Sequence, residues 1–231
     1  SRRQRQMCIR DSAGIKVIMM LNENSYTWYV NQFKNHPAIL MWEFGNEFNY
    51  HPEWFNNNIQ NWYNVLENCA ATVKSLDPNH PVSTGHGEVP DSQALNSCPS
   101  VDVWGMNIYR WLSPDSAIDE LAAVTDKAIY ISEAGADSFN INSNSENESQ
   151  QAEATEIILN AIIAKSDLCI GVTLFEFCDE WWKAGNPNQQ DPGGFSNAIP
   201  YDNFANEEYW GIVNIDRTKK IAFEAVKARF K

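Results

Sequence analysis

The chain has 231 residues, of which 43% are hydrophobic and 12% aromatic, so it is long enough to bury a sizeable core. Its net charge of −13 disfavours nucleic acid and anionic membrane surfaces as partners, and neutral ligands fit better. No apolar run is long enough to span a bilayer. The five cysteines form no CxxC pair, so neither a metal site nor a disulfide framework is predicted, and no cofactor is expected.

Residues 1–12, SRRQRQMCIRDS, carry four arginines and show no amphipathic period. The segment resembles translated adaptor sequence at the ends of metagenomic gene fragments, and we interpret it as a non-native or unstructured leader. A basic tail or the end of a native helix is the alternative. Residues 13–231 are expected to form one domain.

From residue 13 onward, short apolar runs rich in β-branched residues alternate with longer segments of helical period. The predicted strands are residues 16–21, 39–44, 82–84, 101–108, 128–132 and 170–178. The predicted helices are residues 25–35, 54–76, 116–123, 149–165 and 219–230. Strands that are separated by helices and read as near-continuous apolar runs indicate parallel β-α-β units with both faces of the sheet covered.

Polar clusters follow successive predicted strands, at Asn46-Glu47, His86, residues 107–109, Glu133 and residues 179–182. In a barrel the carboxyl ends of all strands converge on one mouth, whereas in an open sheet only those beside the switch point could meet. Neither GxGxxG nor GxxxxGK[ST] occurs. The predicted fold is therefore α/β, a (β/α)8 TIM barrel. Because such barrels typically need about 250 residues and eight strands, we expect a fragment that covers about strands 3 to 8.

Two glutamates in this pattern are candidates for chemistry. Period-two alternation places Glu43, Gly45 and Glu47 on one side of their strand, provided that no bulge intervenes near Gly45. Glu133 ends a later strand in the same manner. Glycoside hydrolysis needs paired carboxyl groups across a mouth, and the apolar neighbours of Glu47 could separate the two roles. For either glutamate alone, a capping or salt-bridged residue at a strand end is the competing interpretation.

Four motifs resemble a known family. Residues 35–47, NHPAILMWEFGNE, resemble the fourth-strand motif of the clan A retaining β-glycosidases, and most of all the catalytic barrel of glycoside hydrolase family 2. Residues 127–136, KAIYISEAGA, resemble the seventh-strand motif that carries the nucleophile. Residues 171–180 resemble the eighth strand, and residues 209–217 resemble the run into the last helix. The resemblance covers residues 13–230.

By this resemblance, Glu47 is the general acid/base and Glu133 the nucleophile. Asn46 would hold the sugar 2-hydroxyl, and Tyr109 would hydrogen-bond the nucleophile. Phe175 stands where the family often presents a tryptophan under the sugar, so Trp181 or Trp182 is expected to supply that platform.

Several other residues are candidates for substrate contact. His86 and Asn107 follow strands at the expected mouth. Aromatic faces bind the apolar faces of pyranose rings, so Trp104 and Trp111 are weaker platform candidates beside Trp181 and Trp182. Glu43 and Glu176 are expected to need partners if buried.

The predicted function is retaining hydrolysis of β-O-glycosidic bonds in an oligo- or polysaccharide through a glycosyl-enzyme intermediate. A β-glucan transglycosylase with the same carboxylate pair is one alternative, and a non-catalytic carbohydrate-binding barrel is another. A third is that a barrel without two of its strands does nothing by itself. The partner is a carbohydrate substrate, and an extracellular or periplasmic location is expected from the substrate class alone.

Overall fold

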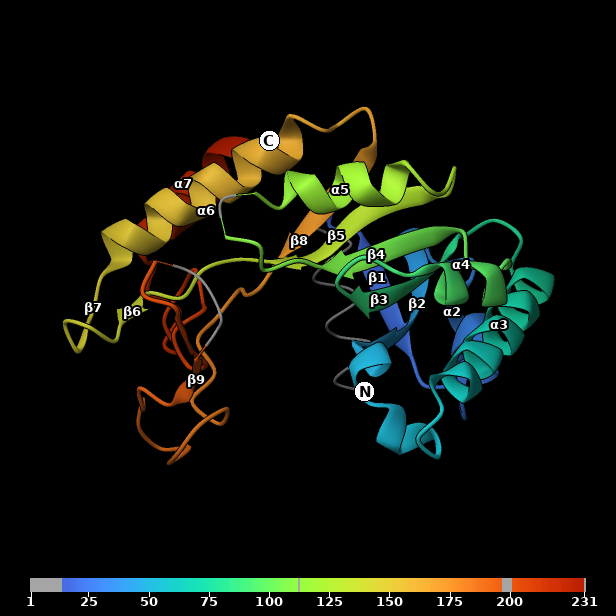
Figure 1. Ribbon diagram of the computed structural model, residues 1–231, viewed down its shortest axis with the longest axis horizontal. Coiled ribbons are helices and arrows are strands. Elements are labelled where there is room, and N and C mark those ends of the chain that lie inside the picture. Colours follow the sequence, from blue (N-terminus) through green and yellow to red (C-terminus); the bar gives the residue numbers. More distant parts are fainter. Residues whose placement is uncertain (1–13, 112, 197–200, 231) are drawn as a thin grey trace. The chain divides into compact units, whose positions relative to one another are not determined.

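The computed structural model describes residues 14–111, 113–196 and 201–230, so the predicted leader at residues 1–12 lies outside the described residues. Six strands are hydrogen-bonded in the order β1-β2-β3-β4-β5-β8. They are β1 (Val17–Leu21), β2 (Ile39–Asn46), β3 (Val82–Gly87), β4 (Val103–Asn107), β5 (Ala128–Ala134) and β8 (Cys169–Leu174). The parallel order matches the predicted alternation of strand and helix (Figure 1).

The described helices are α2 (Tyr26–Phe33), α3 (Ile59–Leu76), α4 (Ser92–Ser97), α5 (Asp115–Ala122), α6 (Glu148–Ile163) and α7 (Ile221–Arg229). Two antiparallel strand pairs, absent from the predictions, lie in loops: β6 (Phe139–Asn140) with β7 (Ser145–Glu146), and β9 (Gly194–Ser196) with β10 (Phe204–Asn206). The short helix α4 was also missed. Its side-chain cap, Asp91, accepts a hydrogen bond from the Ala94 N–H.

The chain divides into two compact units, which are described separately. The first comprises Ser1–Met106 and Val124–Tyr130, and the second comprises Asn107–Ala123 and Ile131–Lys231.

In the first unit, the two sides of β2 are buried differently. Trp42 is fully buried, and its indole Nε1 donates to Asp77 Oδ2 at 2.9 Å. Met41 instead packs in a cluster with Val103 and Tyr130. Both sides of the strand are therefore covered, as expected for a parallel sheet.

In the second unit, α6 and α7 lie side by side (Figure 1). Lys220, directly before α7, is fully buried. Its ammonium lies 2.9 Å from Asp179 Oδ1 and 3.1 Å from Glu146 Oε1, and it donates to Ser138 Oγ at 3.0 Å. A buried cation is tolerated when such partners compensate for its lost hydration. This cluster ties the start of α7 to the loop that follows β8.

None of the described helices combines the length and the apolar character needed to cross a membrane.

Candidate active site

The end of β2 is irregular. Gly45 has φ = 68°, and the register with β3 shifts between Phe44 and Asn46. A Cβ at Gly45 would stand 2.5 Å from Trp62 Cζ2, so only glycine fits there without displacement. The bulge breaks the period-two alternation of side chains. The condition for placing Glu47 on the same side of the strand as Glu43, that no bulge intervenes near Gly45, is therefore not met.

Glu47 comes directly after β2 and is partly buried. Its backbone is left-handed at φ = 55°, which is uncommon for a residue with a side chain. Two backbone hydrogen bonds hold it there: the Glu47 N–H donates to Gly85 O at 2.8 Å, and the Tyr50 N–H donates to Glu47 O at 2.9 Å. The carboxylate therefore leaves the chain from a fixed turn that begins the 3₁₀ segment Phe48–Tyr50.

Glu43 faces the interior of the first unit, with 6% of its surface exposed. Ser83 Oγ donates to its Oε2 at 3.1 Å, and the Tyr130 hydroxyl donates to the same oxygen. Burial raises the pKa of this carboxyl, and the two hydroxyl donors oppose the shift. The expectation that Glu43 needs partners is met.

His86 is engaged through both ring nitrogens. Nδ1 lies 3.0 Å from Glu88 O, and Nε2 lies 3.5 Å from the Tyr63 hydroxyl. Burial lowers the pKa of the imidazole, and its ring packs edge-on against Trp104. Trp104 is itself 1% exposed, so this side chain is a core residue and the prediction of a sugar platform there is wrong.

Glu133 lies on β5 in the second unit and is partly buried. The Tyr109 hydroxyl donates to Glu133 Oε2 at 2.8 Å. The backbone supports this pairing, because the Ile108 N–H donates to Glu133 O at 2.8 Å. The contact implied by the family resemblance is therefore present. The predicted roles of both residues stay predictions.

The Tyr109 ring packs against two other aromatic rings. Tyr109 meets Trp210 at a centroid distance of 5.3 Å and Phe175 at 6.3 Å, both edge-to-face. Phe175 and Trp210 are 5.6 Å apart. Such packing restricts the tilt of the Tyr109 ring and so the position of its hydroxyl.

Asn107, a predicted substrate contact, is 2% exposed and accepts a hydrogen bond from Ser132 Oγ at 2.6 Å.

Lys183 is a functional candidate that sequence reasoning missed. Its ammonium stands 4.0 Å above the centre of the Phe175 ring and pairs with Glu176 at 2.8 Å and Glu180 at 3.3 Å. Only 11% of its side chain is exposed. Burial raises the pKa of Glu176 to about 7, and Lys183 opposes the shift. The sequence signal for this cluster was the spacing, because Lys183 follows Glu180 by three residues and Glu176 by seven.

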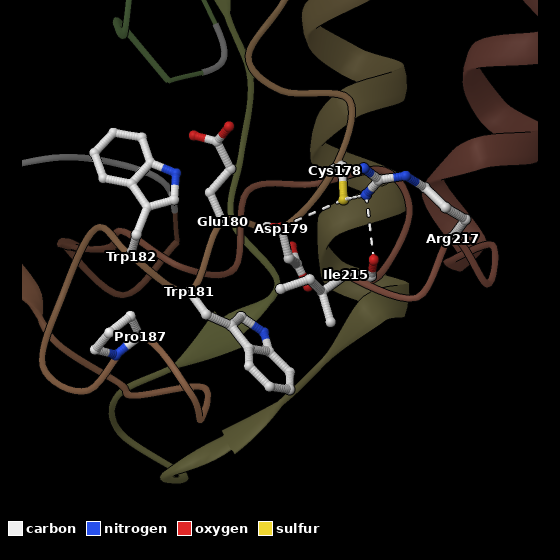
Figure 2. A pocket seen from close by; sticks show the side chains of 8 residues that line it. All are labelled: Cys178, Asp179, Glu180, Trp181, Trp182, Pro187, Ile215 and Arg217. Carbon is white, nitrogen blue, oxygen red and sulfur yellow. Dashed lines mark hydrogen bonds between the residues drawn. The ribbon is translucent and has the colours of Figure 1, made fainter.

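Residues of the loop after β8, together with Ile215 and Arg217, line a pocket of about 250 Å³ (Figure 2). Trp181 and Trp182 both line it, and their indoles point in different directions. Trp182 is 70% exposed. The predicted strand 170–178 ends at Leu174, so this pocket belongs to a loop instead of a continuing strand.

The predicted site residues divide between the two units. Asn46, Glu47 and His86 belong to the first, while Asn107, Tyr109, Glu133, Trp181 and Trp182 belong to the second. The structure brings together Tyr109 and Glu133. Among the described residues, no group of three or more metal-ligating side chains is arranged to hold an ion.

Parallel strands that alternate with helices and carry polar side chains at their carboxyl ends are the arrangement of a TIM-barrel enzyme. The chain belongs to glycosyl hydrolase family 2, because residues 20–231 match the model of this family's TIM barrel domain. The predicted family and the predicted fold, a partial (β/α)8 barrel, are thereby confirmed.

Individual relatives share less with the chain. Mannan endo-1,4-beta-mannosidase F of Aspergillus clavatus is 41% identical over 56 residues, which are 24% of this chain and 12% of that protein. The Bifidobacterium dentium beta-glucuronidase, solved with coumarin-3-O-glucuronide, is 20% identical with a TM-score of 0.61, over 96% of this chain and 38% of that one. A Rhizomucor miehei beta-1,3-glucanosyltransferase, solved with laminaritriose, is 15% identical with a TM-score of 0.64, over 94% of this chain and 79% of that one. The chain thus spans well under half of the mannosidase and of the glucuronidase, and the two solved structures support the fold alone.

Proposed function

We propose that this domain is a retaining β-glycosidase that acts on β-linked oligo- or polysaccharide. The observation that carries the proposal is the hydrogen bond from Tyr109 to Glu133, within a chain of glycosyl hydrolase family 2. A nucleophilic carboxylate must be held in one orientation for attack on the anomeric carbon, and the ring packing around Tyr109 supports such an orientation.

The reaction has two steps with two carboxyl groups in named roles. Glu47 donates a proton to the glycosidic oxygen while Glu133 attacks the anomeric carbon, which releases the leaving sugar and leaves a glycosyl ester on Glu133. Glu47 then takes a proton from water, the water oxygen attacks the same carbon, and the ester bond to Glu133 breaks. The anomeric configuration is inverted twice and therefore retained.

The position of Glu47 supports its role as acid and base. Its left-handed backbone is anchored on Gly85, and strain of this kind clusters at functional sites. Asn46, its neighbour, is assigned to the sugar 2-hydroxyl by the motif. His86 and Asn107, the other predicted substrate contacts beside strand ends, have hydrogen-bond partners inside the protein.

The test is turnover of a panel of aryl β-glycosides by the purified protein beside Glu47→Ala and Glu133→Ala. Both variants should lose activity, and azide should rescue Glu133→Ala with an α-glycosyl azide as product, because azide attacks in place of the carboxylate. Glu224→Ala is the matched control, since this exposed glutamate lies on α7. Unchanged activity in Glu133→Ala would overturn the mechanism.

Products distinguish the alternatives. Elongated saccharides formed from an added acceptor sugar would identify a transglycosylase with the same pair of carboxylates. Sugar binding without turnover of any glycoside would identify a binding barrel.

A further inference from the structure

The chain directly after β8 runs beside the strand of the predicted nucleophile. The Phe175 N–H donates to Ala134 O at 3.0 Å, and Ala134 is the residue after Glu133. A Cβ at Gly135 would clash with the Phe175 carbonyl oxygen, so the two backbones approach as closely as glycine allows. The backbone that carries the Phe175 ring is therefore tied to β5 next to Glu133.

The Phe175 ring packs against the donor of the Glu133 hydrogen bond. It meets Tyr109 edge-to-face at a centroid distance of 6.3 Å, and it meets Trp210 at 5.6 Å. Tyr109 donates its hydroxyl hydrogen to Glu133 Oε2 at 2.8 Å. A rotation of the Phe175 ring would remove packing from Tyr109 and leave the hydroxyl less constrained.

Lys183 fixes the orientation of the Phe175 ring. Its ammonium stands 4.0 Å from the centre of the ring, and only 11% of the lysine side chain is exposed. The attraction between a cation and an aromatic ring strengthens when the cation is shielded from water. The ammonium is itself held by Glu176 Oε2 at 2.8 Å and by Glu180 Oε2 at 3.3 Å.

A simple surface ion pair would not need this buried arrangement. Glu180 is 38% exposed, so a pair between it and Lys183 alone could form in solvent, where such pairs contribute little. Glu176 instead draws the ammonium inward, and burial of this second carboxyl raises its pKa to about 7. The desolvation is offset by placement of the cation over the ring that packs on Tyr109, and all these residues belong to the second unit.

We infer that Lys183 is a positioning residue for the proposed nucleophile Glu133. Held by Glu176, its ammonium orients the Phe175 ring. That ring orients Tyr109, whose hydroxyl sets the direction of the Glu133 carboxylate. The inference rests on the proposed glycosidase function, and it deepens that function by naming a residue that acts on the nucleophile from outside the reacting pair.

The test measures how fast Glu133 forms its glycosyl ester. The probes are the 2,4-dinitrophenyl 2-deoxy-2-fluoro-β-glycosides of glucose, galactose, mannose and glucuronic acid. The carboxylate bonds to the anomeric carbon as dinitrophenolate leaves, and the fluorine slows hydrolysis of the ester, so labelled protein accumulates. Mass spectrometry of the intact protein gives the labelling rate constant at saturation, ki, and the reagent concentration at half-saturation, Ki.

We expect Lys183→Met to lower ki about tenfold and to change Ki less than twofold, because the variant alters the orientation of the nucleophile and not the contacts of the sugar. The Tyr109→Phe background separates this role from a general loss of structure. There the hydroxyl that the ring positions is absent, so Lys183→Met should change ki by less than twofold.

Lys165→Met is the matched control. This lysine lies before β8 in the same unit, is 27% exposed and pairs with Asp119 at 2.6 Å, so its loss should leave ki unchanged. If Lys183→Met does not fold, Lys183→Met/Glu176→Gln leaves no stranded carboxylate and should show the same fall in ki. An unchanged ki in the folded variant, or the same fall with and without the Tyr109 hydroxyl, would overturn the inference.

Failure of the proposed function shows separately. Absence of labelling in the wild-type protein would overturn the role of Glu133 as nucleophile. The contact of Lys183 with Phe175 is measured without any sugar, by urea unfolding. Lys183→Met should lower the folding equilibrium constant about fivefold more in the wild type than in Phe175→Leu. Equal effects in the two backgrounds would overturn the inference even where the wild type is labelled.

Discussion

Replacement of Lys220 by methionine tests the buried ion cluster that anchors the loop after β8. The Lys220 ammonium is fully buried, 2.9 Å from Asp179 and 3.1 Å from Glu146. Methionine keeps most of the side-chain volume but leaves the Asp179 carboxylate, 1% exposed, without its cation. Removal of one partner of a buried ion pair costs ~3–5 kcal/mol of unfolding free energy.

The structure sets the expectation within that range. Asp179 keeps the Gly211 N–H on Oδ1 at 2.9 Å and the Gln190 side chain on Oδ2 at 3.1 Å. Because these donors continue to stabilise the charge, we expect a loss at the lower end, ~3 kcal/mol. Burial raises the pKa of Asp179, and Lys220 is the main influence that opposes this shift. In Lys220→Met, Asp179 can therefore take up a proton, which further limits the loss of stability.

The assay is urea unfolding followed by tryptophan fluorescence and circular dichroism. Lys219→Met is the control, because Lys219 is 56% exposed and lies 3.6 Å from Glu224, and its loss should change stability by less than ~0.5 kcal/mol. The double variant Lys220→Met/Asp179→Asn should recover part of the loss, since no charge is left stranded. Equal midpoints for Lys219→Met and Lys220→Met would refute the argument.

Three further predictions follow from single contacts. Tyr109→Phe removes the donor to Glu133. Since a hydrogen bond to a charged group contributes ~1.5–3 kcal/mol, kcat/KM on an aryl glycoside should fall ~10- to 150-fold, and an unchanged value would contradict the predicted role. Burial raises the pKa of Asp137 to about 8, so between about pH 4 and pH 8 the folded state binds one proton more than the unfolded state. The free energy of unfolding therefore falls by up to ~1.4 kcal/mol per pH unit as the pH rises through this range. Urea unfolding at pH 5 and pH 8 should show a smaller difference in stability for Asp137→Asn than for the wild type. Gly45→Ala places a Cβ at a positive φ and 2.5 Å from the Trp62 ring. The free energy of unfolding, measured by urea unfolding, should therefore fall by at least ~1–2 kcal/mol, and wild-type stability would contradict the bulge.

The main elements could be predicted from local sequence. Strands buried on both faces read as continuous apolar runs, and all six predicted ones are present within a few residues, apart from the premature end of the last. The predicted helix 54–76 begins instead at Ile59, because Asn56 and Asn57 adopt positive φ and Asn58 caps the helix by accepting from the Gln60 N–H. Asparagine tolerates the left-handed conformation, so this turn was readable in principle.

The details of the candidate site depend on contacts between distant residues. The pairing of Tyr109 with Glu133 joins positions 24 apart and was predicted only from the family motif. The bulge at Gly45 was a stated condition of the strand pattern, and only the paired strand β3 reveals it. Lys220 and Asp179 are 41 residues apart, and no local period links them. Side chains in irregular loops have no repeat from which a partner can be deduced.

The buried carboxyl groups of the second unit show why a raised pKa alone does not identify a catalyst here. Burial raises the pKa of Glu176 to about 7 and that of Asp137 to about 8. Both have an oxygen with no hydrogen-bond partner among the described residues. Yet Asp137 accepts the Asn206 N–H through its other oxygen, and Glu176 holds Lys183 over Phe175, so each fixes a segment of the loop that carries the two tryptophans. Carboxyl groups with a raised pKa arise wherever a polar loop is packed tightly. The catalytic assignment of Glu47 and Glu133 therefore depends on motif, contact and strand position taken together.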